Sequence, residues 1–262
     1  MPAFATHFFY AKKVYEESDK EVKKLIERYR SYYDLGAQGP DIFFYYKPYK
    51  RNNIAAYGSS LHNKQAKRLF EEAIKKIKEV DDQAAFVYLL GLGTHFSLDS
   101  SFHPIINKKY TEFNDHMILE AELDRRIIEQ NVRFKPHKFR RNLLINARYK
   151  YGYDLQFVYP KIDSKYIDES IYQTNFYMKV LYSPNNIKGK IISLLCKTFI
   201  KGADFSNLII KKKPNTAYDK TVDELIKKYP DAITTGVNNL KNLVDVYNGK
   251  AKMDKYFYNT FE

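Results

Sequence analysis

Side chains that can bind a metal ion form two pairs with i, i+4 spacing in the first half of the chain. His95 and Asp99 are one pair, and His116 and Glu120 are the other. Because four residues are about one helical turn, each pair would project from one helix face and could hold one cation. One such pair is usually only a hydrogen-bonded pair, but two within 26 residues favour a metal centre. Imidazole with carboxylate suits zinc, and manganese or iron can also bind there.

The sequence before His95 indicates that its pair is buried. The apolar run 89–94 leads directly into His95 and contains Gly91 and Gly93. Each glycine lowers the stability of a helix by about 1 kcal/mol relative to alanine, so close packing around the site is expected to offset that cost. A buried imidazole beside a buried Asp99 also needs compensation, which a metal ion would supply.

Apolar side chains recur with helical spacing along almost the whole chain, which predicts an all-α protein. A turn-rich loop, Gly36–Asp41, ends the first helix and presents Asp41. Thr6 is expected to cap that helix, and residues 42–49 are expected to form a short strand or a loop wall. The predicted helices cover residues 6–33, 63–80, 83–100, 111–130, 138–149, 164–181, 187–210 and 220–247, the last as one helix or as two that break near Pro230.

The 262 residues show no internal repeat and no low-complexity linker, which predicts a single compact multi-helix domain over residues 1–262. Within it, residues 1–130 hold the candidate ligands and residues 131–262 are basic, with 133–136 as the weakest boundary. We find neither a secretory signal nor an apolar stretch of the ~20 residues that a transmembrane helix needs. Cys196 is the single cysteine and lies in an apolar run, so we expect a buried structural thiol and a cytoplasmic protein.

The net charge of +13 is unevenly distributed. Residues 1–130 have 20 Lys and Arg against 19 Asp and Glu, whereas residues 131–262 have 24 against 12. A basic half can attract phosphate groups, an anionic membrane surface or nucleic acid. A lysine-rich surface that is simply well solvated fits the same counts, so both interpretations stay open.

Read along the chain, the histidines and acids form a longer ordered series. Its members are His7, Asp41 in Gly-Pro-Asp, His62, His95 and Asp99 in Gly-Thr-His-Phe-Ser-Leu-Asp, His103, His116 and Glu120. Over about residues 1–125 this series resembles that of the bacterial zinc-dependent phospholipase C family, and more distantly that of zinc-dependent single-strand nucleases of the same fold. Five of the six histidines take part, and His137 is left over.

The resemblance implies an all-helical fold and a cluster of two or three zinc ions. It assigns one ion to Asp41, His62, His95 and Asp99, a second to His103, His116 and Glu120, and a third to His7 with Asp99 as a bridge. The implied reaction is hydrolysis of a phosphoester, with a phospholipid head group as the family's usual substrate, by water that bound zinc activates. Asp41 could orient this water or act as the base.

Other functions fit parts of the sequence. A zinc-dependent nuclease would use the basic half to bind a nucleic-acid backbone, and a hydrolase of a small phosphoester would need the metal centre alone. A non-enzymatic helical module would bind nucleic acid or a membrane surface through residues 131–262 and would hold no metal. Phe44, Tyr45 and Tyr46 follow Asp41 and could either line a substrate pocket or pack in the core.

Overall fold

The computed structural model describes residues 3–185, 187–199 and 203–262. These residues form α-helices and short 3-10 helices and contain no strand, which confirms the all-α prediction. The α-helices are α1 (Phe4–Glu17), α2 (Lys20–Arg28), α3 (Arg30–Gly36), α4 (Asn53–His62), α5 (Ala66–Val80), α6 (Gln83–Lys109), α7 (Phe113–Asn131), α8 (Gly152–Leu155), α9 (Ser164–Val180), α10 (Ile187–Phe199) and α11 (Asp219–Tyr247). The 3-10 helices are η1 (Gly39–Tyr45), η2 (Pro136–Lys138), η3 (Arg141–Leu143), η4 (Phe205–Leu208), η5 (Thr216–Tyr218) and η6 (Lys255–Tyr258).

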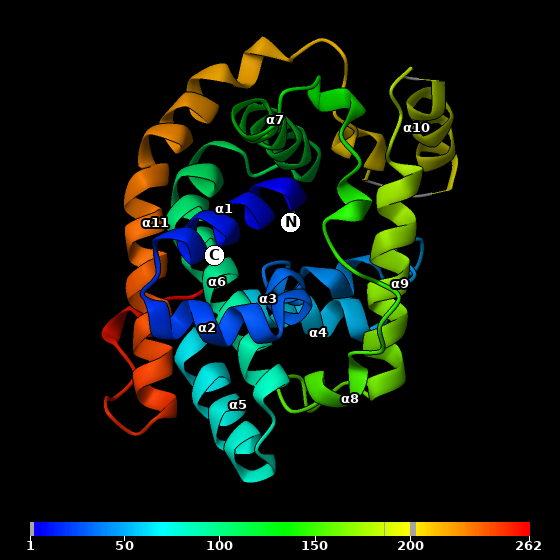
Figure 1. Cartoon of the computed structure of the whole chain (residues 1–262). Coiled ribbons are helices and arrows are strands. Elements are labelled where there is room, and N and C mark those ends of the chain that lie inside the picture. Colours follow the sequence, from blue (N-terminus) through cyan, green and yellow to red (C-terminus); the bar gives the residue numbers. More distant parts are fainter. Residues whose placement is uncertain (1–2, 186, 200–202) are drawn as a thin grey trace.

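Helix α6 is the centre of the fold, and α1, α3, α5 and α11 pack around it (Figure 1). Every residue from 85 to 99 is buried, so this helix is enclosed on all sides rather than along one stripe. The side chain of Asp82 caps its first turn by accepting a hydrogen bond from the Ala85 N–H at 2.9 Å. Polar side chains on the middle turns of α6 therefore lie in the interior.

Helices α3 and α6 touch backbone to backbone. A Cβ atom at Gly91 would lie 2.2 Å from the carbonyl oxygen of Tyr33, and one at Gly36 would lie 2.2 Å from the carbonyl oxygen of Tyr88. No larger residue fits at either position without moving a helix. The close packing expected around the glycines of α6 is therefore present at Gly91, and it brings the segment after α3 against α6.

The prediction of one helix over residues 6–33 is wrong, because this segment forms α1, α2 and α3. Ser18 is extended and ends α1, and the carboxylate of Asp19 begins α2 by capping its first turn. Tyr29 leaves the helical region and separates α2 from α3. The prediction that Thr6 caps the first helix is also wrong, since Thr6 lies inside α1.

Two prolines lie inside helices. Helix α6 continues through Pro104 to Lys109, well past the predicted end near residue 100, and α11 runs unbroken through Pro230. A proline removes one hydrogen bond of the ladder and costs about 3 kcal/mol, but buried residues on both sides of each proline hold the helix in place. The predicted helix over 187–210 is confirmed for α10, and residues 200–202 lie outside the described part. From residue 203 to 210 the prediction is wrong, because the chain there forms only the 3-10 helix η4.

Three further segments differ from prediction. The sequence reading missed α4, whose cap is Asn52, with its side chain accepting from two N–H groups of the first turn. The prediction of a helix over residues 138–149 is wrong, because this segment contains only short 3-10 turns, and Arg141 within it is buried. Residues 42–45 belong to the 3-10 helix η1 and form no strand. The predicted helices near α5, α7 and α9 are confirmed.

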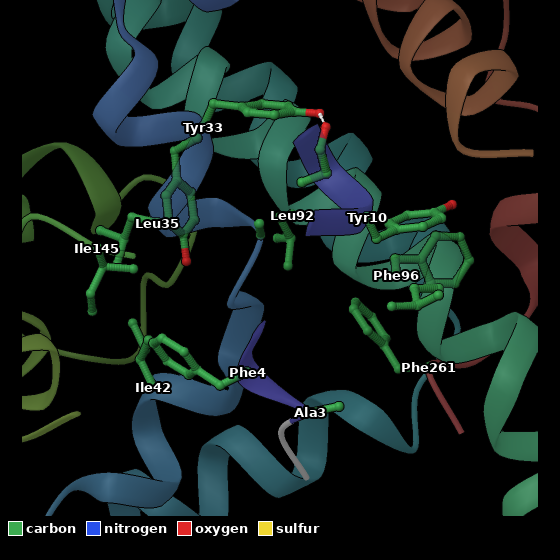
Figure 2. Packing of buried hydrophobic residues seen from close by; sticks show 14 of the residues in the cluster. Ala3, Phe4, Tyr10, Tyr33, Leu35, Ile42, Leu92, Phe96, Ile145 and Phe261 are labelled. Atoms are coloured by element: carbon green, nitrogen blue, oxygen red, sulfur yellow. Dashed lines mark hydrogen bonds between the residues drawn. The ribbon is translucent and has the colours of Figure 1, made fainter. Parts of the chain in front are cut away.

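The segment after α11 returns to the middle of the molecule (Figure 1). Figure 2 shows Phe261 beside Phe96 of α6, with ring centroids 5.1 Å apart. The N–H of Phe261 donates to the carbonyl of His62 at 3.2 Å, and the N–H of Ala66 donates to the carbonyl of Asn259 at 3.0 Å. This segment therefore joins the end of α4 to α6.

We expect Gly91→Ala to lower the free energy of unfolding by about 3 kcal/mol or prevent folding, because the new methyl group meets backbone atoms that cannot rotate away. Gly189→Ala in α10 is the control, since its Cβ would meet only the end of the Ile209 side chain at 3.3 Å. Denaturant unfolding should show the control unchanged or up to about 1 kcal/mol more stable. Equal stability of Gly91→Ala and the wild type would contradict the close contact of α3 with α6.

Candidate metal centre

The structure brings all eight candidate ligands into one buried region. His7 comes from α1, Asp41 from η1, His62 from the last turn of α4, His95, Asp99 and His103 from α6, and His116 and Glu120 from α7. Seven of them are buried, and His116 is the exception, with 16% of its side chain exposed. Three sets of ligand atoms each lie within 4.8 Å of one another: His7, His95 and Asp99; Asp41, His62 and His95; and His103, His116 and Glu120.

Asp99 connects these groups. Its Oδ1 lies 3.2 Å from Nε2 of His7, and its Oδ2 lies 3.0 Å from Nε2 of His95 and 3.9 Å from Nε2 of His62. Nδ1 of His103 lies 4.0 Å from Oδ1. One carboxylate therefore faces imidazoles from three helices, which is the position of a bridging ligand.

The imidazoles are oriented by backbone carbonyl groups. Nδ1 of His62 lies 3.0 Å from the carbonyl oxygen of Gly58, Nδ1 of His95 lies 3.2 Å from that of Ala37, and Nδ1 of His103 lies 2.8 Å from that of Phe261. A carbonyl oxygen can only accept, so each Nδ1 carries a proton, and in the neutral imidazole each Nε2 then keeps the lone pair that a metal ion would use. Ligand histidines in metalloproteins are held in the same way.

Several buried polar atoms of this cluster make no hydrogen bond. They are Nδ1 of His7, both carboxylate oxygens of Asp41, and Nε2 of His62 and His95. Oδ1 of Asp41 lies only 3.0 Å from Nε2 of His62. The two atoms are therefore close enough for a hydrogen bond, but their orientation does not allow one. Buried polar groups without partners cost about 1–3 kcal/mol each, and a cation placed among these atoms would remove that cost. The residues therefore fit a metal ion.

The donor set also indicates the kind of centre. It has five imidazoles and three carboxylates, and Cys196 lies elsewhere, in α10. Structural zinc sites favour cysteine and use closed tetrahedral sets, whereas catalytic sites combine histidine and carboxylate ligands with an open position. The composition is therefore that of a catalytic centre.

The charges of Asp99 and His95 depend on each other. Burial tends to raise the pKa of Asp99, but His95, His103 and His7 outweigh it and hold this pKa well below its ordinary value. Burial tends to lower the pKa of His95, while Asp99 and Asp41 raise it above its ordinary value. Without metal, the carboxylates therefore keep their negative charge and attract positive charge into the interior.

Asp124 fixes the helix that carries His7. Its carboxylate is fully buried and accepts hydrogen bonds from the N–H groups of Ala5 at 3.2 Å and Thr6 at 2.8 Å, and from the Thr6 hydroxyl at 2.9 Å. The Arg141 guanidinium donates to it at 3.2 Å and to the carbonyl of Leu208. Burial raises the pKa of Asp124, and Arg141 and the N–H groups counteract only part of this effect. These contacts hold the residues directly before His7.

Gly39 makes room for His95. Its φ of +53° is in the left-handed region, which favours glycine. A Cβ at this position would lie 2.4 Å from Cδ2 and 2.8 Å from Nε2 of His95. The turn before Asp41 therefore passes directly over the imidazole. The positive φ and the contact with His95 each exclude a larger residue at position 39.

A cavity of about 770 Å³ opens beside the centre. Its lining is mainly apolar and aromatic, and includes Phe44, Tyr45 and Tyr177. His116, the most exposed of the candidate ligands, contributes to its wall. A substrate that occupied this cavity would reach the metal centre on the side of His116.

Of the aromatic residues after Asp41, Phe44 and Tyr45 line the cavity, whereas Tyr46 packs in the core. Cys196 is buried, as expected, and also lines the cavity. The leftover His137 lies in η2, away from the three ligand sets.

Three residues that position the ligands were not found from the sequence. Phe261 and Asp124 act over 158 and up to 119 residues of chain, and nothing in their local sequence indicates a partner. The sequence predicts Gly39 to be a turn residue, but it does not reveal that the imidazole of His95 lies against this turn.

An all-helical fold with clustered histidines and carboxylates at its centre defines a class of metal-dependent proteins. The zinc dependent phospholipase C family matches residues 6–181, which is more than half of the chain, and the chain belongs to this family. Its members are hydrolases that depend on zinc. Comparison with curated proteins and with solved structures gives no match.

Gly39→Ala should displace His95 and reduce bound zinc by at least one ion per chain, since the added methyl group overlaps the imidazole. Gly249→Ala is a matched control, because Gly249 also has a positive φ, of +72°, but has no atom within 4 Å of the added Cβ. Elemental analysis of both variants measures the effect, with circular dichroism to monitor folding. If both variants lose zinc equally, backbone strain rather than the contact with His95 is responsible.

Asp124→Asn should lower the free energy of unfolding by about 3 kcal/mol, because it leaves the buried Arg141 without its carboxylate. It should also weaken zinc binding at His7, which would appear as one ion lost at a lower chelator concentration than the others. Asp223→Asn removes an exposed ion pair with Arg126 and should change stability by less than about 1 kcal/mol. Unchanged stability of Asp124→Asn would contradict the positioning role.

Proposed function

We propose that the protein hydrolyses phosphoester bonds in the manner of a phospholipase C. The observation that carries this proposal is the buried centre itself, with unpartnered atoms on Asp41, His62 and His95 and an adjoining cavity that reaches His116. Membership of the zinc dependent phospholipase C family supports it. The free thiol of Cys196 supports a reducing, cytoplasmic setting as part of the proposal.

The residues suggest how two or three zinc ions would be held. One set would be Asp41, His62 and His95 with Oδ2 of Asp99; a second would be His103, His116 and Glu120; a third would be His7 with Oδ1 of Asp99. Zinc at these places would supply Lewis acidity, which polarises a phosphoryl oxygen and lowers the pKa of water. Manganese or iron could occupy the same donors.

Asp41 is the best candidate for the proton-handling group. Neither of its oxygens makes a hydrogen bond, so one can serve as a ligand while the other accepts a proton from the attacking water. Its place in η1 is fixed by the turn at Gly39, and its neighbours Phe44 and Tyr45 line the cavity in which the substrate would lie. Asp41 would thus orient the water toward phosphorus without a Ser or Cys nucleophile.

The lining of the cavity favours a lipid as the source of the phosphoester. Among the described residues that line it, Lys50 is the only lysine or arginine, and most of the others are apolar or aromatic. A nuclease would instead need a cationic groove that follows the nucleic-acid backbone. A phospholipid satisfies both parts of the site, because its phosphate can reach the metal centre while its apolar part fills the cavity. The basic second half supports peripheral contact with an anionic membrane.

Zinc content and hydrolysis should fall together in Asp99→Ala. We expect two or three zinc ions per chain in wild-type protein purified without chelator or nickel resin, and at most one in the variant. Release of the phosphorylated head group from a dispersed short-chain phosphatidylcholine should fall more than about 100-fold, since even outer-shell partners of a metal can contribute that much. Asp223→Ala, at an exposed carboxylate, is the control. Wild-type protein that holds no stoichiometric metal would refute the proposal.

A further inference from the structure

Helix α10 exposes apolar side chains at the edge of the molecule. Ile187, Ile191, Leu194 and Leu195 are 65%, 55%, 67% and 51% exposed. Their i, i+4, i+7 and i+8 spacing puts them on one face of the helix, and Figure 1 shows α10 at the periphery beside α9. Thr198 lies on the same face, but its hydroxyl donates to the carbonyl of Leu194 at 2.9 Å. The face therefore offers a continuous apolar surface, which marks an interaction site.

Lysines border this face on both sides. Lys188 lies along one edge, and Lys190 and Lys197 lie along the other, all three exposed. The sequence 187–199 contains no acidic residue. An apolar face with lysines at its edges is the pattern of a helix that lies in the plane of a membrane surface, where the ammonium groups reach the lipid phosphates.

The opposite face of α10 forms a wall of the cavity beside the metal centre. Ile192 and Cys196 line this cavity, which extends to His116. Tyr49 and Phe113 also line it and are 60% and 42% exposed, so apolar side chains continue from the outer surface into the cavity. A molecule held at the outer face of α10 would therefore be close to the cavity.

We propose that α10 is an interfacial docking helix that binds an anionic lipid surface and places the cavity against it. This inference rests on the proposed function, because it identifies the substrate as a lipid that is still in a membrane. Leu194 and its apolar neighbours would enter the acyl boundary while Lys188, Lys190 and Lys197 contact anionic head groups. A lipid could then move into the cavity along its apolar wall and bring its phosphate to His116.

The charges favour a lipid surface over a second copy of the chain. Two copies of α10 packed face to face would bring their lysines together with no carboxylate between them, and like charges at an interface are unfavourable. An anionic membrane matches both the lysine edges and the apolar centre. A nucleic acid would match the lysines only and would leave the leucines in water.

Vesicle binding by the full-length zinc-loaded protein tests this proposal. Wild-type protein should sediment with vesicles of phosphatidylcholine containing phosphatidylglycerol, and much less with phosphatidylcholine alone. Leu194→Glu should weaken binding about tenfold or more, because it removes an apolar side chain that would be buried in the lipid and adds a charge that the anionic surface repels. Val80→Glu is the matched control, since Val80, the last residue of α5, is 49% exposed, and Figure 1 shows α5 in a different part of the molecule from α10. Its binding should equal that of the wild type.

A triple variant, with Lys188, Lys190 and Lys197 each changed to Gln, separates the electrostatic part. Each lysine near an anionic surface contributes a factor of about five, so binding should fall about 100-fold. Binding of the triple variant should no longer depend on the phosphatidylglycerol content of the vesicles. All variants should keep the zinc content and the circular dichroism spectrum of the wild type.

Hydrolysis of two substrates distinguishes failure of the docking proposal from failure of the proposed function. Leu194→Glu should hydrolyse dispersed short-chain phosphatidylcholine at the wild-type rate but vesicle phosphatidylcholine at least about tenfold more slowly. Equal loss of both rates, equal binding by Leu194→Glu and Val80→Glu, or a wild-type dimer that Leu194→Glu converts to monomer would each overturn the docking role. Absence of hydrolysis by the wild type would refute the proposed function, while vesicle binding would still test α10.

Discussion

The rest of the structure depends on the burial of negative charge at Asp99. The Asp99 side chain is 7% exposed and lies among the imidazoles of His7, His62 and His95 rather than in water. An isolated buried carboxylate costs several kcal/mol even after the protein relaxes, and Asp41 and Glu120 bury two more within the same region. Neutral imidazoles provide lone pairs but no compensating charge. Only cations, as protons on the imidazoles or as metal ions, make this interior stable, and the atoms without hydrogen-bond partners are placed to receive metal.

The need to bring cations to the buried carboxylates explains the scaffold around the centre. The ligands come from α1, η1, α4, α6 and α7, so their positions depend on how these elements pack. The contact of Gly36 with Gly91 fixes α3 on α6, Gly39 lets the following turn cross His95, and Asp124 ties the start of α1 to α7. None of these residues binds metal in our proposal. They allow charged and polar groups to meet in a region that would otherwise contain only apolar side chains.

The candidate ligands could be predicted from the sequence, but only part of their surroundings could. The pairs of His95 with Asp99 and His116 with Glu120 could be predicted, because i, i+4 spacing is a local property of a helix. The all-α class followed from apolar periodicity, and the family from the order of the histidines. The breaks between α1, α2 and α3 were missed, because a short polar residue such as Asp19 competes with the helix only weakly in a periodic pattern.

Contacts between distant parts of the chain could not be predicted at all. Phe261 accepts the hydrogen bond of His103 through its backbone carbonyl from 158 residues away, and an apolar residue near the end of the sequence gives no sign of such a partner. The role of Arg141 was hidden for the same reason, and its segment was wrongly predicted to be helical. In the structure Arg141 is buried and paired with Asp124, at a position where the chain forms only the 3-10 helix η3.

The boundary of the family match falls between the candidate ligands and part of the cavity wall. All eight candidate ligands lie within residues 6–181, the part that the zinc dependent phospholipase C family matches. The cavity beside them is completed by Ile192 and Cys196 of α10 and by Phe205 and Leu208 of η4, which all lie beyond residue 181. In our proposal the matched part would cleave the phosphoester and would line most of the apolar cavity, while α10 and η4 complete the wall of this cavity. In the same proposal α10 also contacts the membrane, so this helix would contribute both to the cavity wall and to the approach to the lipid surface.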